Sequence, residues 1–122
     1  MDKQGQGCVL VVEDHADTLR FLLRLLAMSG YTAHGAGSVH EAMQVAERER
    51  CRLLVADLGL PDGSGIELLR TLRQQADIKG IAVTGHGGED VFHAARAAGF
   101  AAHLVKPVTF EKLLQALRAV DN

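Results

Sequence analysis

The sequence predicts an α/β protein in which five short strands alternate with five helices, the (βα)5 pattern of a doubly wound parallel sheet. Short apolar runs recur along the 122 residues, and each is followed by a segment whose apolar residues have helical spacing. Right-handed crossovers between parallel strands close such a chain into one sheet with helices on both faces. We therefore expect one domain over residues 1–122, with a core of about 8–120.

The first half of the chain supplies three strands and two helices. A helix predicted from Asp17 to Ser29 carries four leucines at positions i, i+3, i+4 and i+7, and Gly30 ends it. Ser38 and Glu41 have the spacing of a capping box, which predicts that a second helix begins there. The predicted strands run from Val9 to Glu13, from Tyr31 to Ala36 and from Leu53 to Asp57.

The second half supplies two strands and three helices. Residues 58–64 are rich in turn-forming residue types and are predicted to form a loop after the third strand. Residues 85–88 form a second, glycine-rich loop. The predicted elements are a helix from Gly65 to Gln75, a strand from Gly80 to Thr84, a helix from Glu89 to Ala98, a strand from Ala101 to Val105 and a helix from Phe110 to Val120.

Four of the apolar strands end on polar residues of the kinds that phosphoryl chemistry uses. Glu13 and Asp14 stand at the end of the first strand, and Asp57 ends the third. Thr84 ends the fourth strand, and Lys106 follows the fifth. The carboxyl ends of parallel strands lie along one edge of an open sheet, and ligands bind at that edge. The sequence therefore predicts a crevice that holds three carboxylates, a hydroxyl and an ammonium group.

Composition and charge argue against several classes of function. The formal net charge is −2, and no cluster of lysine or arginine marks a nucleic-acid surface. Aromatic residues make up 4% of the chain, which disfavours a stacking platform for single-stranded nucleic acid. No apolar run has the length of a membrane span, and the first residues lack the pattern of a secretory signal. We expect a cytoplasmic protein whose partners are neither nucleic acid nor membrane.

The two cysteines, Cys8 and Cys51, lie at or beside predicted strands. Because nothing indicates secretion, we expect them to be reduced and packed rather than bridged. The cysteines do not form a CxxC pair, and the six histidines lack the His-x3-His ligand spacing. These spacings argue against a structural zinc site.

The strand ends carry recognisable motifs. Each motif alone is a weak signal, whereas all of them in order, each at the end of the right strand, are a strong one. Together they resemble the receiver domains of two-component response regulators, the CheY-like family, from Cys8 to about Ala119. The resemblance implies the flavodoxin-like strand order 2-1-3-4-5. The motifs are Val-Val-Glu13-Asp14, Val-Ala-Asp57-Leu-Gly-Leu-Pro61-Asp-Gly-Ser-Gly65, Ala-Val-Thr84-Gly and Leu-Val-Lys106-Pro107.

The acidic residues of the crevice are suited to Mg²⁺. This cation prefers oxygen ligands and keeps several water molecules. Asp14 and Asp57 can supply carboxylate oxygens, the carbonyl of Gly59 can supply another, and Glu13 is expected to act through a bound water. Three clustered carboxylates without a cation would force at least one pKa upward, and a divalent ion removes that conflict.

Asp57 is the expected phosphoacceptor, which attacks phosphorus and becomes an aspartyl phosphate. Phosphoryl transfer depends mainly on positioning and charge stabilisation. The ammonium group of Lys106 would flank the phosphoryl oxygens, and the hydroxyl of Thr84 would donate a hydrogen bond to the phosphoryl group. The resemblance further implies that the bond between Lys106 and Pro107 is cis, an arrangement that X–Pro bonds tolerate.

Each of these residues could instead have an ordinary structural role. Asp14 could merely cap a helix, Asp57 could be a solvated loop residue, and Lys106 could be an ordinary surface lysine. A Mg²⁺-dependent phosphohydrolase is one rival function, but that fold usually carries a second acid where this chain has Gly59. An interaction module that has lost phosphorylation is another, but it predicts a broken acidic set. We favour the receiver because it is improbable that all five strand-end residues have ordinary structural roles at the same time. These residues are Glu13, Asp14, Asp57, Thr84 and Lys106.

Two histidines depart from the usual receiver pattern or stand beside it. His103 occupies the position at which the family generally carries Tyr or Phe, whose ring takes part in switching. We expect either a polar, pH-sensitive switch there or a partly exposed strand histidine of modest role. His86, two residues after Thr84, and Gly59, two after Asp57, are expected to influence the lifetime of the phosphoryl group.

The first helix carries a second apolar face, which includes Phe21, Leu25 and Met28. A contiguous exposed apolar patch often marks an interface. In receivers this helix lies beside the active-site edge, so we expect Thr18, Phe21 and Leu25 to contact a histidine kinase or a histidine phosphotransfer domain. The alternatives are a wider buried face and a dimer contact.

The prediction that follows is a phosphoacceptor signalling domain rather than an enzyme. It takes phosphate from a phosphohistidine onto Asp57 with Mg²⁺ and then changes the surface that it offers to a downstream protein partner. The sequence segments around Asp57, Thr84 and Lys106 resemble those of receivers in hybrid histidine kinases more than those of receivers in transcription factors. The chain is therefore expected to be the terminal receiver of such a kinase or a free single-domain regulator.

Overall fold

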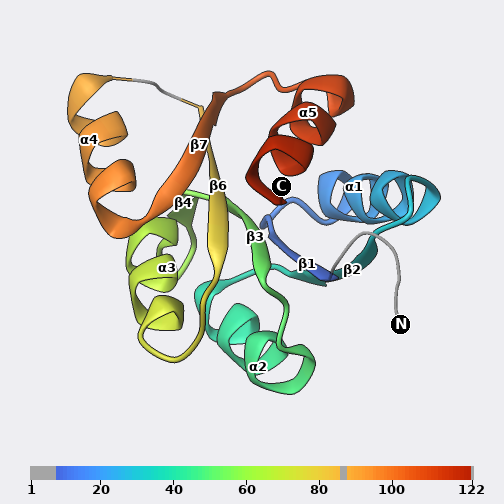
Figure 1. Cartoon of the computed structure of the whole chain (residues 1–122), viewed down its shortest axis with the longest axis horizontal. Helices are drawn as coiled ribbons and strands as arrows, with labels where there is room; N and C mark the ends of the chain where they lie inside the picture. Colours follow the sequence, from blue (N-terminus) through green and yellow to red (C-terminus); the bar gives the residue numbers. More distant parts are fainter. Residues whose placement is uncertain (1–7, 86–87, 122) are drawn as a thin grey trace.

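The computed structural model describes residues 8–85 and 88–121, and it contains a five-stranded parallel sheet with helices on both faces (Figure 1). The strands lie in the order β2-β1-β3-β6-β7, which is the order 2-1-3-4-5 when only the strands of this sheet are numbered. The predicted fold class is therefore confirmed. The strands are β1 (Cys8–Val12), β2 (Thr32–Ala36), β3 (Leu53–Asp57), β6 (Lys79–Thr84) and β7 (Phe100–Val105).

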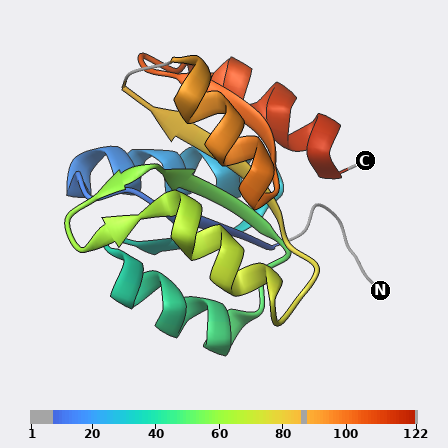
Figure 2. The same cartoon turned by 90° about the vertical axis from the view of Figure 1, so that its left-hand side faces the viewer.

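The helices divide between the two faces of the sheet. Helices α1 and α5 pack on one face, and α2, α3 and α4 pack on the other (Figures 1 and 2). Within the described residues, no helix combines the length and the apolar character needed to cross a membrane. The helices are α1 (Ala16–Met28), α2 (Val39–Glu49), α3 (Gly65–Arg73), α4 (Glu89–Ala98) and α5 (Phe110–Asp121). The ends of α1, α3, α4 and α5 lie within two residues of the predicted ones, and α2 begins directly after the predicted cap, Ser38.

Two apolar cores lie on opposite faces of the sheet, because successive side chains of a strand point to opposite faces. Val9 and Val11 of β1 belong to the core under α1 and α5, whereas Leu10 and Val12 belong to the core under α2, α3 and α4. All five residues of β3 are buried, as its continuous apolar run predicts. Full burial of a valine or leucine side chain contributes about 1.5–3 kcal/mol. The burial of the central strands therefore stabilises the positions of the residues at their ends.

The loop after β3 contains a short hairpin that the sequence did not predict. Its strands are β4 (Gly59–Leu60) and β5 (Gly63–Ser64), which pair in antiparallel fashion. At its tip, the carboxylate of Asp62 accepts hydrogen bonds from the backbone N–H groups of Val39 at 2.7 Å and His40 at 2.9 Å. These bonds lower the pKa of Asp62. They also fasten the loop to the first turn of α2.

The predicted capping of α2 is confirmed in part. The hydroxyl of Ser38 accepts a hydrogen bond from the backbone N–H of Glu41 at 3.1 Å, as in a capping box. The carboxylate of Glu41, however, accepts from the N–H of Gly37 at 2.6 Å, one residue before the cap. Side-chain oxygens therefore accept hydrogen bonds from backbone N–H groups both before and after the start of α2.

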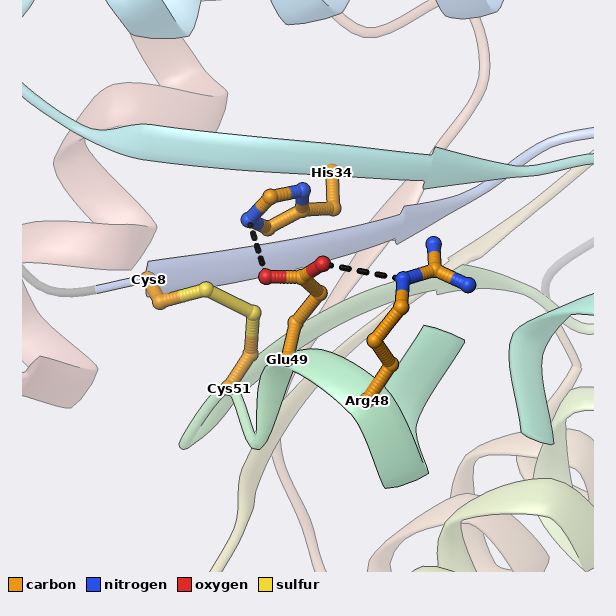
Figure 3. Close-up of a disulfide and its surroundings, with 5 residues drawn as sticks. All are labelled: Cys8, His34, Arg48, Glu49 and Cys51. Atoms are coloured by element: carbon orange, nitrogen blue, oxygen red, sulfur yellow. Dashed lines mark hydrogen bonds and ion pairs between the residues drawn. A yellow bond between two sulfur atoms is a disulfide. The ribbon is translucent and has the colours of Figure 1, made fainter. Parts of the chain in front are cut away.

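Cys8 and Cys51 form a disulfide, so the prediction that they are not bridged was wrong (Figure 3). The two cysteines have a sequence separation of 43 residues but lie close together in space. Strands β1 and β3 are neighbours, and Val9 stands opposite Leu53. This register brings the first residue of β1 beside the segment that enters β3, with a Cα–Cα distance of 4.8 Å, which a disulfide can span.

Candidate phosphoacceptor site

Three of the predicted side chains meet at the carboxyl edge of the sheet. Asp57 ends β3, Glu13 follows β1, and Lys106 follows β7. The Nζ atom of Lys106 lies 2.7 Å from Oδ2 of Asp57 and 3.4 Å from Oε1 of Glu13. Both carboxylates are buried, with 9% of Asp57 and 5% of Glu13 exposed. An ammonium group from the edge strand thus lies between two buried carboxylates from the central strands.

Backbone hydrogen bonds beyond the strand ends hold these residues in place. The N–H of Glu13 donates to the carbonyl of Ala36 at 3.0 Å, and the N–H of Lys106 donates to the carbonyl of Thr84 at 2.8 Å. The peptide bond between Lys106 and Pro107 is cis, which confirms the expectation drawn from the family resemblance. Each side chain therefore projects from backbone that is anchored to a neighbouring strand.

The charge state of Lys106 is fixed by its surroundings. Burial lowers the pKa of the Lys106 ammonium, but the hydrogen bond to Asp57 and the negative charges of Asp57 and Glu13 outweigh burial and raise the pKa above 10.5. The group is therefore a cation at neutral pH. A fixed positive charge of this kind stabilises negative charge that develops nearby.

His15 belongs to the same cluster, although no motif in the sequence assigns it a role. Its ring Nδ1 and its backbone N–H each lie 3.0 Å from Oε2 of Glu13, and the ring Nδ1 lies 3.6 Å from Oδ1 of Asp14. The hydrogen bond to Glu13 and the charge of Asp14 raise the pKa of His15 above 6.5. The signal in the sequence was its position directly after the acidic pair.

The donor groups at this edge fit a hard divalent cation. Ligand atoms of Glu13, Asp14 and His15 all lie within 4.8 Å of one another. Oδ1 of Asp57 accepts a hydrogen bond from the N–H of Gly59 at 3.2 Å. Carboxylate oxygens dominate the set, which suits Mg²⁺. Among the described residues at this site, three carboxylates face one lysine, so a divalent cation would balance the remaining negative charge.

Thr84 and His103 lie in different surroundings on neighbouring strands. Thr84 ends β6, one residue beyond Val83, which is the register partner of Asp57. His103 lies in β7 opposite Ala82, and its ring packs edge-on against Phe92 of α4 with 4.2 Å between the ring centres. Within the described residues, neither ring nitrogen of His103 has a hydrogen-bond partner, although both are buried. Burial lowers the pKa of His103.

The remaining predicted residues lie around the rim of the site. Gly59 is exposed, and a Cβ atom added there would have no neighbour within 4 Å, so this position leaves room above Asp57. His86 lies outside the described residues. On α1, Phe21 is 61% exposed, Thr18 is exposed and Leu25 is partly buried.

A cleft runs from the site between α1 and α5. It encloses about 590 Å³, and its apolar lining comes from both helices, from strands β3 and β6, and from the segment before α5. These apolar residues are Leu22, Val55, Val83, Pro107, Val108 and Leu113. The polar residues at its mouth are Glu13, His15 and Lys106, with Thr18 on the α1 side. The cleft therefore joins the acidic edge to the helix whose exposed face was predicted to bind a partner.

Residues 9–118 match the model of a protein family described as the response regulator receiver domain. The chain belongs to this family. A similar curated protein is the KDP operon transcriptional regulatory protein KdpE of Escherichia coli strain K12. The two are 36% identical over 110 residues, which cover 90% of this chain and 49% of KdpE. The receiver domain thus spans about half the length of that relative.

Solved structures of other receivers share the fold. A CheY-like receiver domain protein of Methanospirillum hungatei superposes with a TM-score of 0.87 at 28% identity, over 94% of this chain and 93% of that chain. A response regulator of Burkholderia pseudomallei, solved with a phosphorylated aspartic acid, a calcium ion and citrate, has a TM-score of 0.83 at 30% identity. That match covers 90% of this chain and 65% of the other. This receiver is therefore a domain of two-component signal transduction.

Proposed function

We propose that Asp57 accepts a phosphoryl group from a phosphohistidine on a histidine kinase or a histidine phosphotransfer domain. The observation that carries this proposal is the state of its carboxylate, which is buried and hydrogen-bonded to Lys106 at 2.7 Å through Oδ2. Oδ1 accepts a hydrogen bond from the N–H of Gly59. A nucleophile held in this way needs little reorientation before attack. The phosphorylated aspartic acid of the Burkholderia pseudomallei relative supports the assignment.

The residues around Asp57 have separate tasks in this proposal. Mg²⁺, when bound, neutralises charge on the transferring phosphoryl group, and the residues that would hold it are Glu13, Asp14, Asp57 and the carbonyl of Gly59. The Lys106 ammonium attracts the phosphoryl oxygens, since its raised pKa keeps it charged. The hydroxyl of Thr84 donates a hydrogen bond to the phosphoryl group. Gly59 and His86 tune how readily water reaches the product.

The signal leaves the domain through a protein contact on α4, β7 and α5. Phe92 and Val105 are 42% and 43% exposed on this side, and exposed apolar residues favour a protein partner. His103 packs against Phe92, which makes it the candidate link between Thr84 and this surface. A downstream protein, rather than nucleic acid or membrane, is the partner proposed for this domain.

The phosphodonor docks on α1, beside the cleft that this helix forms with α5. The proposed docking residues are Thr18, Phe21 and Leu25 of α1, of which Thr18 lines the cleft that opens beside Glu13 and Lys106. The exposure of Phe21 supports this docking surface, because a large exposed apolar ring is typical of an interface.

We assign the domain to the cytoplasm, where the ATP that charges a histidine kinase is made. In this setting it acts as a phosphoacceptor that promotes its own phosphorylation and dephosphorylation, and not as an enzyme with a separate substrate. The residues of the motifs around Asp57 and Lys106 favour the terminal receiver of a hybrid histidine kinase as the parent protein.

Incubation with acetyl phosphate and Mg²⁺ tests the proposal directly. Intact-mass measurement should detect one added phosphoryl group in the wild type and none in Asp57→Ala. Asp77→Ala is the matched control, because Asp77 is exposed and lies between α3 and β6. Addition of phosphate to Asp57→Ala, or none to the wild type at saturating Mg²⁺, would overturn the assignment.

A further inference from the structure

A second cluster of reactive side chains lies at the amino end of the sheet, away from the phosphoacceptor site. Cys8 and Cys51 form the disulfide, and the ring of His34 and the carboxylate of Glu49 lie beside it (Figure 3). The sulfur atoms and a ring nitrogen of His34 all lie within 4.8 Å of one another. None of these groups takes part in the phosphoryl chemistry proposed above.

Strand register explains why these residues meet. Cys8 stands opposite Thr32 and Leu10 stands opposite His34, so Cys8 and His34 lie on the same face of neighbouring strands. Cys51 belongs to the core on that face, and Cys8 packs against the same core. Three separate segments of the chain thus bring two sulfurs and an imidazole to one point.

We propose that this cluster, in its reduced form, is a zinc site with the thiolates of Cys8 and Cys51 and the imidazole of His34 as ligands. Thiolate and imidazole suit zinc, whereas the carboxylates at the other end of the sheet suit magnesium. Ligand atoms around tetrahedral zinc are separated by about 3.3–3.8 Å, given bonds of about 2.0–2.3 Å. Groups already within 4.8 Å need only modest side-chain rotation to reach that geometry.

Glu49 and Arg48 support the site from the end of α2. Oε1 of Glu49 lies 3.3 Å from Nε2 of His34, and Oε2 lies 3.0 Å from Nε of Arg48. A carboxylate that contacts a ligating histidine orients its ring and strengthens metal binding. Three protein ligands leave a fourth coordination position, as in zinc sites that keep a water molecule.

The disulfide and the metal exclude each other, so the site responds to redox conditions. A dithiol reductant breaks the S–S bond by supplying two electrons and two protons, and it is itself oxidised to a disulfide. Zinc then replaces the two thiol protons and binds the thiolates. A cytoplasm keeps thiols reduced, so the metal-binding form is the one expected in the compartment assigned to this domain.

Zinc binding can be measured on the full chain in two redox states. The protein is reduced with a phosphine, freed of reductant under argon and titrated with Zn²⁺ in competition with a chromophoric chelator, and with Co²⁺ as a spectroscopic probe. The reduced wild type should bind one zinc more than the oxidised wild type, which has the same sequence and the same acidic edge. Only the cobalt form of the reduced protein should show a thiolate-to-metal charge-transfer band.

Variants assign the ligands. Cys8→Ser with Cys51→Ser should lose the site and the charge-transfer band. His34→Ala should weaken zinc binding at least about tenfold, and Glu49→Gln should have a smaller effect of the same sign. His93→Ala is the control, because His93 is exposed on α4, away from the cluster.

Two results would overturn the proposal. One is a reduced wild type that binds no more zinc than the oxidised protein; the other is unchanged affinity in His34→Ala. Phosphorylation by acetyl phosphate should persist in His34→Ala, because the cluster lies at the far end of β1 and β3. Zinc that remains bound in the double cysteine variant would belong to the acidic edge. Equal zinc binding by this variant and by the reduced wild type would also count against the site.

Discussion

The two ends of strands β1 and β3 carry side chains of opposite chemical character. At the carboxyl ends, Glu13 and Asp57 present oxygen atoms beside the ammonium of Lys106. At the amino ends, Cys8 and Cys51 present sulfur beside His34. The buried apolar residues of the strands separate the two groups. One pair of strands can therefore support hard, oxygen-rich chemistry at one end and thiol chemistry at the other without interference.

Removal of Lys106 should have the largest effect, and only at the carboxyl end. Lys106→Ala leaves Asp57 and Glu13 without their shared cation. We expect phosphorylation by acetyl phosphate to slow by roughly 10²–10³-fold, the usual result of losing one preorganised charge-stabilising donor. The rate is followed by intact mass over time. Lys112→Ala, on the exposed side of α5, is the control and should keep the wild-type rate. An equal rate in both variants would contradict the role of Lys106.

Reduction of the disulfide should have the next largest effect, and it should act on stability. The bond closes a segment with a sequence separation of 43 residues, and breaking it lets the unfolded chain expand. We expect the free energy of unfolding to fall by roughly 2–4 kcal/mol in the presence of a metal chelator. Urea unfolding with and without a phosphine reductant measures it. The double variant Cys8→Ser with Cys51→Ser should not respond to the reductant. Equal unfolding midpoints for the oxidised and reduced wild type would show that the bond adds no stability.

A methyl group at Gly65 should disturb the carboxyl end through packing alone. A Cβ atom there would lie 2.5 Å from the backbone carbonyl oxygen of Asp57. Relief of that clash must shift backbone, so Gly65→Ala should lower the free energy of unfolding by roughly 1–3 kcal/mol and slow phosphorylation. Gly85→Ala is the matched control, since a Cβ at Gly85 would meet nothing within 4 Å. A Gly65→Ala protein as stable and as reactive as this control would refute the argument.

Substitution of His103 should have the smallest effect. His103 lies in β7 and belongs to neither of the two groups at the ends of β1 and β3. Its buried ring nitrogens have no hydrogen-bond partner among the described residues, so His103→Phe should raise the free energy of unfolding by about 1 kcal/mol at neutral pH. Burial lowers the pKa of His103, so the folded protein resists protonation that the unfolded chain accepts below pH 6.5. The wild type should therefore lose stability as the pH falls below 6.5, and His103→Phe should lose less.

Urea unfolding above and below pH 6.5 compares the two proteins. His15 acts with the opposite sign, because its raised pKa gives stability that is present below pH 6.5 and is lost as the pH rises. Since both proteins keep His15, the difference between them isolates His103. Parallel pH profiles would mean that His103 titrates alike in the folded and unfolded chains.

The features that the sequence predicted depend on order along the chain. Alternating apolar runs and helical spacing indicated a doubly wound parallel sheet, because a (βα)5 chain with right-handed crossovers has few ways to close. The strand order came from the resemblance to receiver domains. Glu13, Asp57 and Lys106 could be predicted to meet because each stands directly at the end of a strand. Parallel strands then place these ends along one edge.

The features that the sequence did not predict depend on contacts across the fold. The disulfide follows from the register of β1 against β3, which is not evident from two cysteines with a sequence separation of 43. The ring of His15 contacts the carboxylate of Glu13 through a turn whose geometry no sequence motif predicts. The packing of His103 against Phe92 requires the position of α4 on the sheet. The sequence alone sets none of these distances.

The contact of Asp62 with α2 has a consequence for the order in which the chain assembles during synthesis. The carboxylate that receives the N–H groups of Val39 and His40 is made more than twenty residues after them. Helix α2 therefore leaves the ribosome before its first turn can be completed, and the segment that carries the phosphoacceptor completes it. A nascent fragment that ends before Asp62 should leave these two amides open to hydrogen exchange, whereas the full chain should protect them.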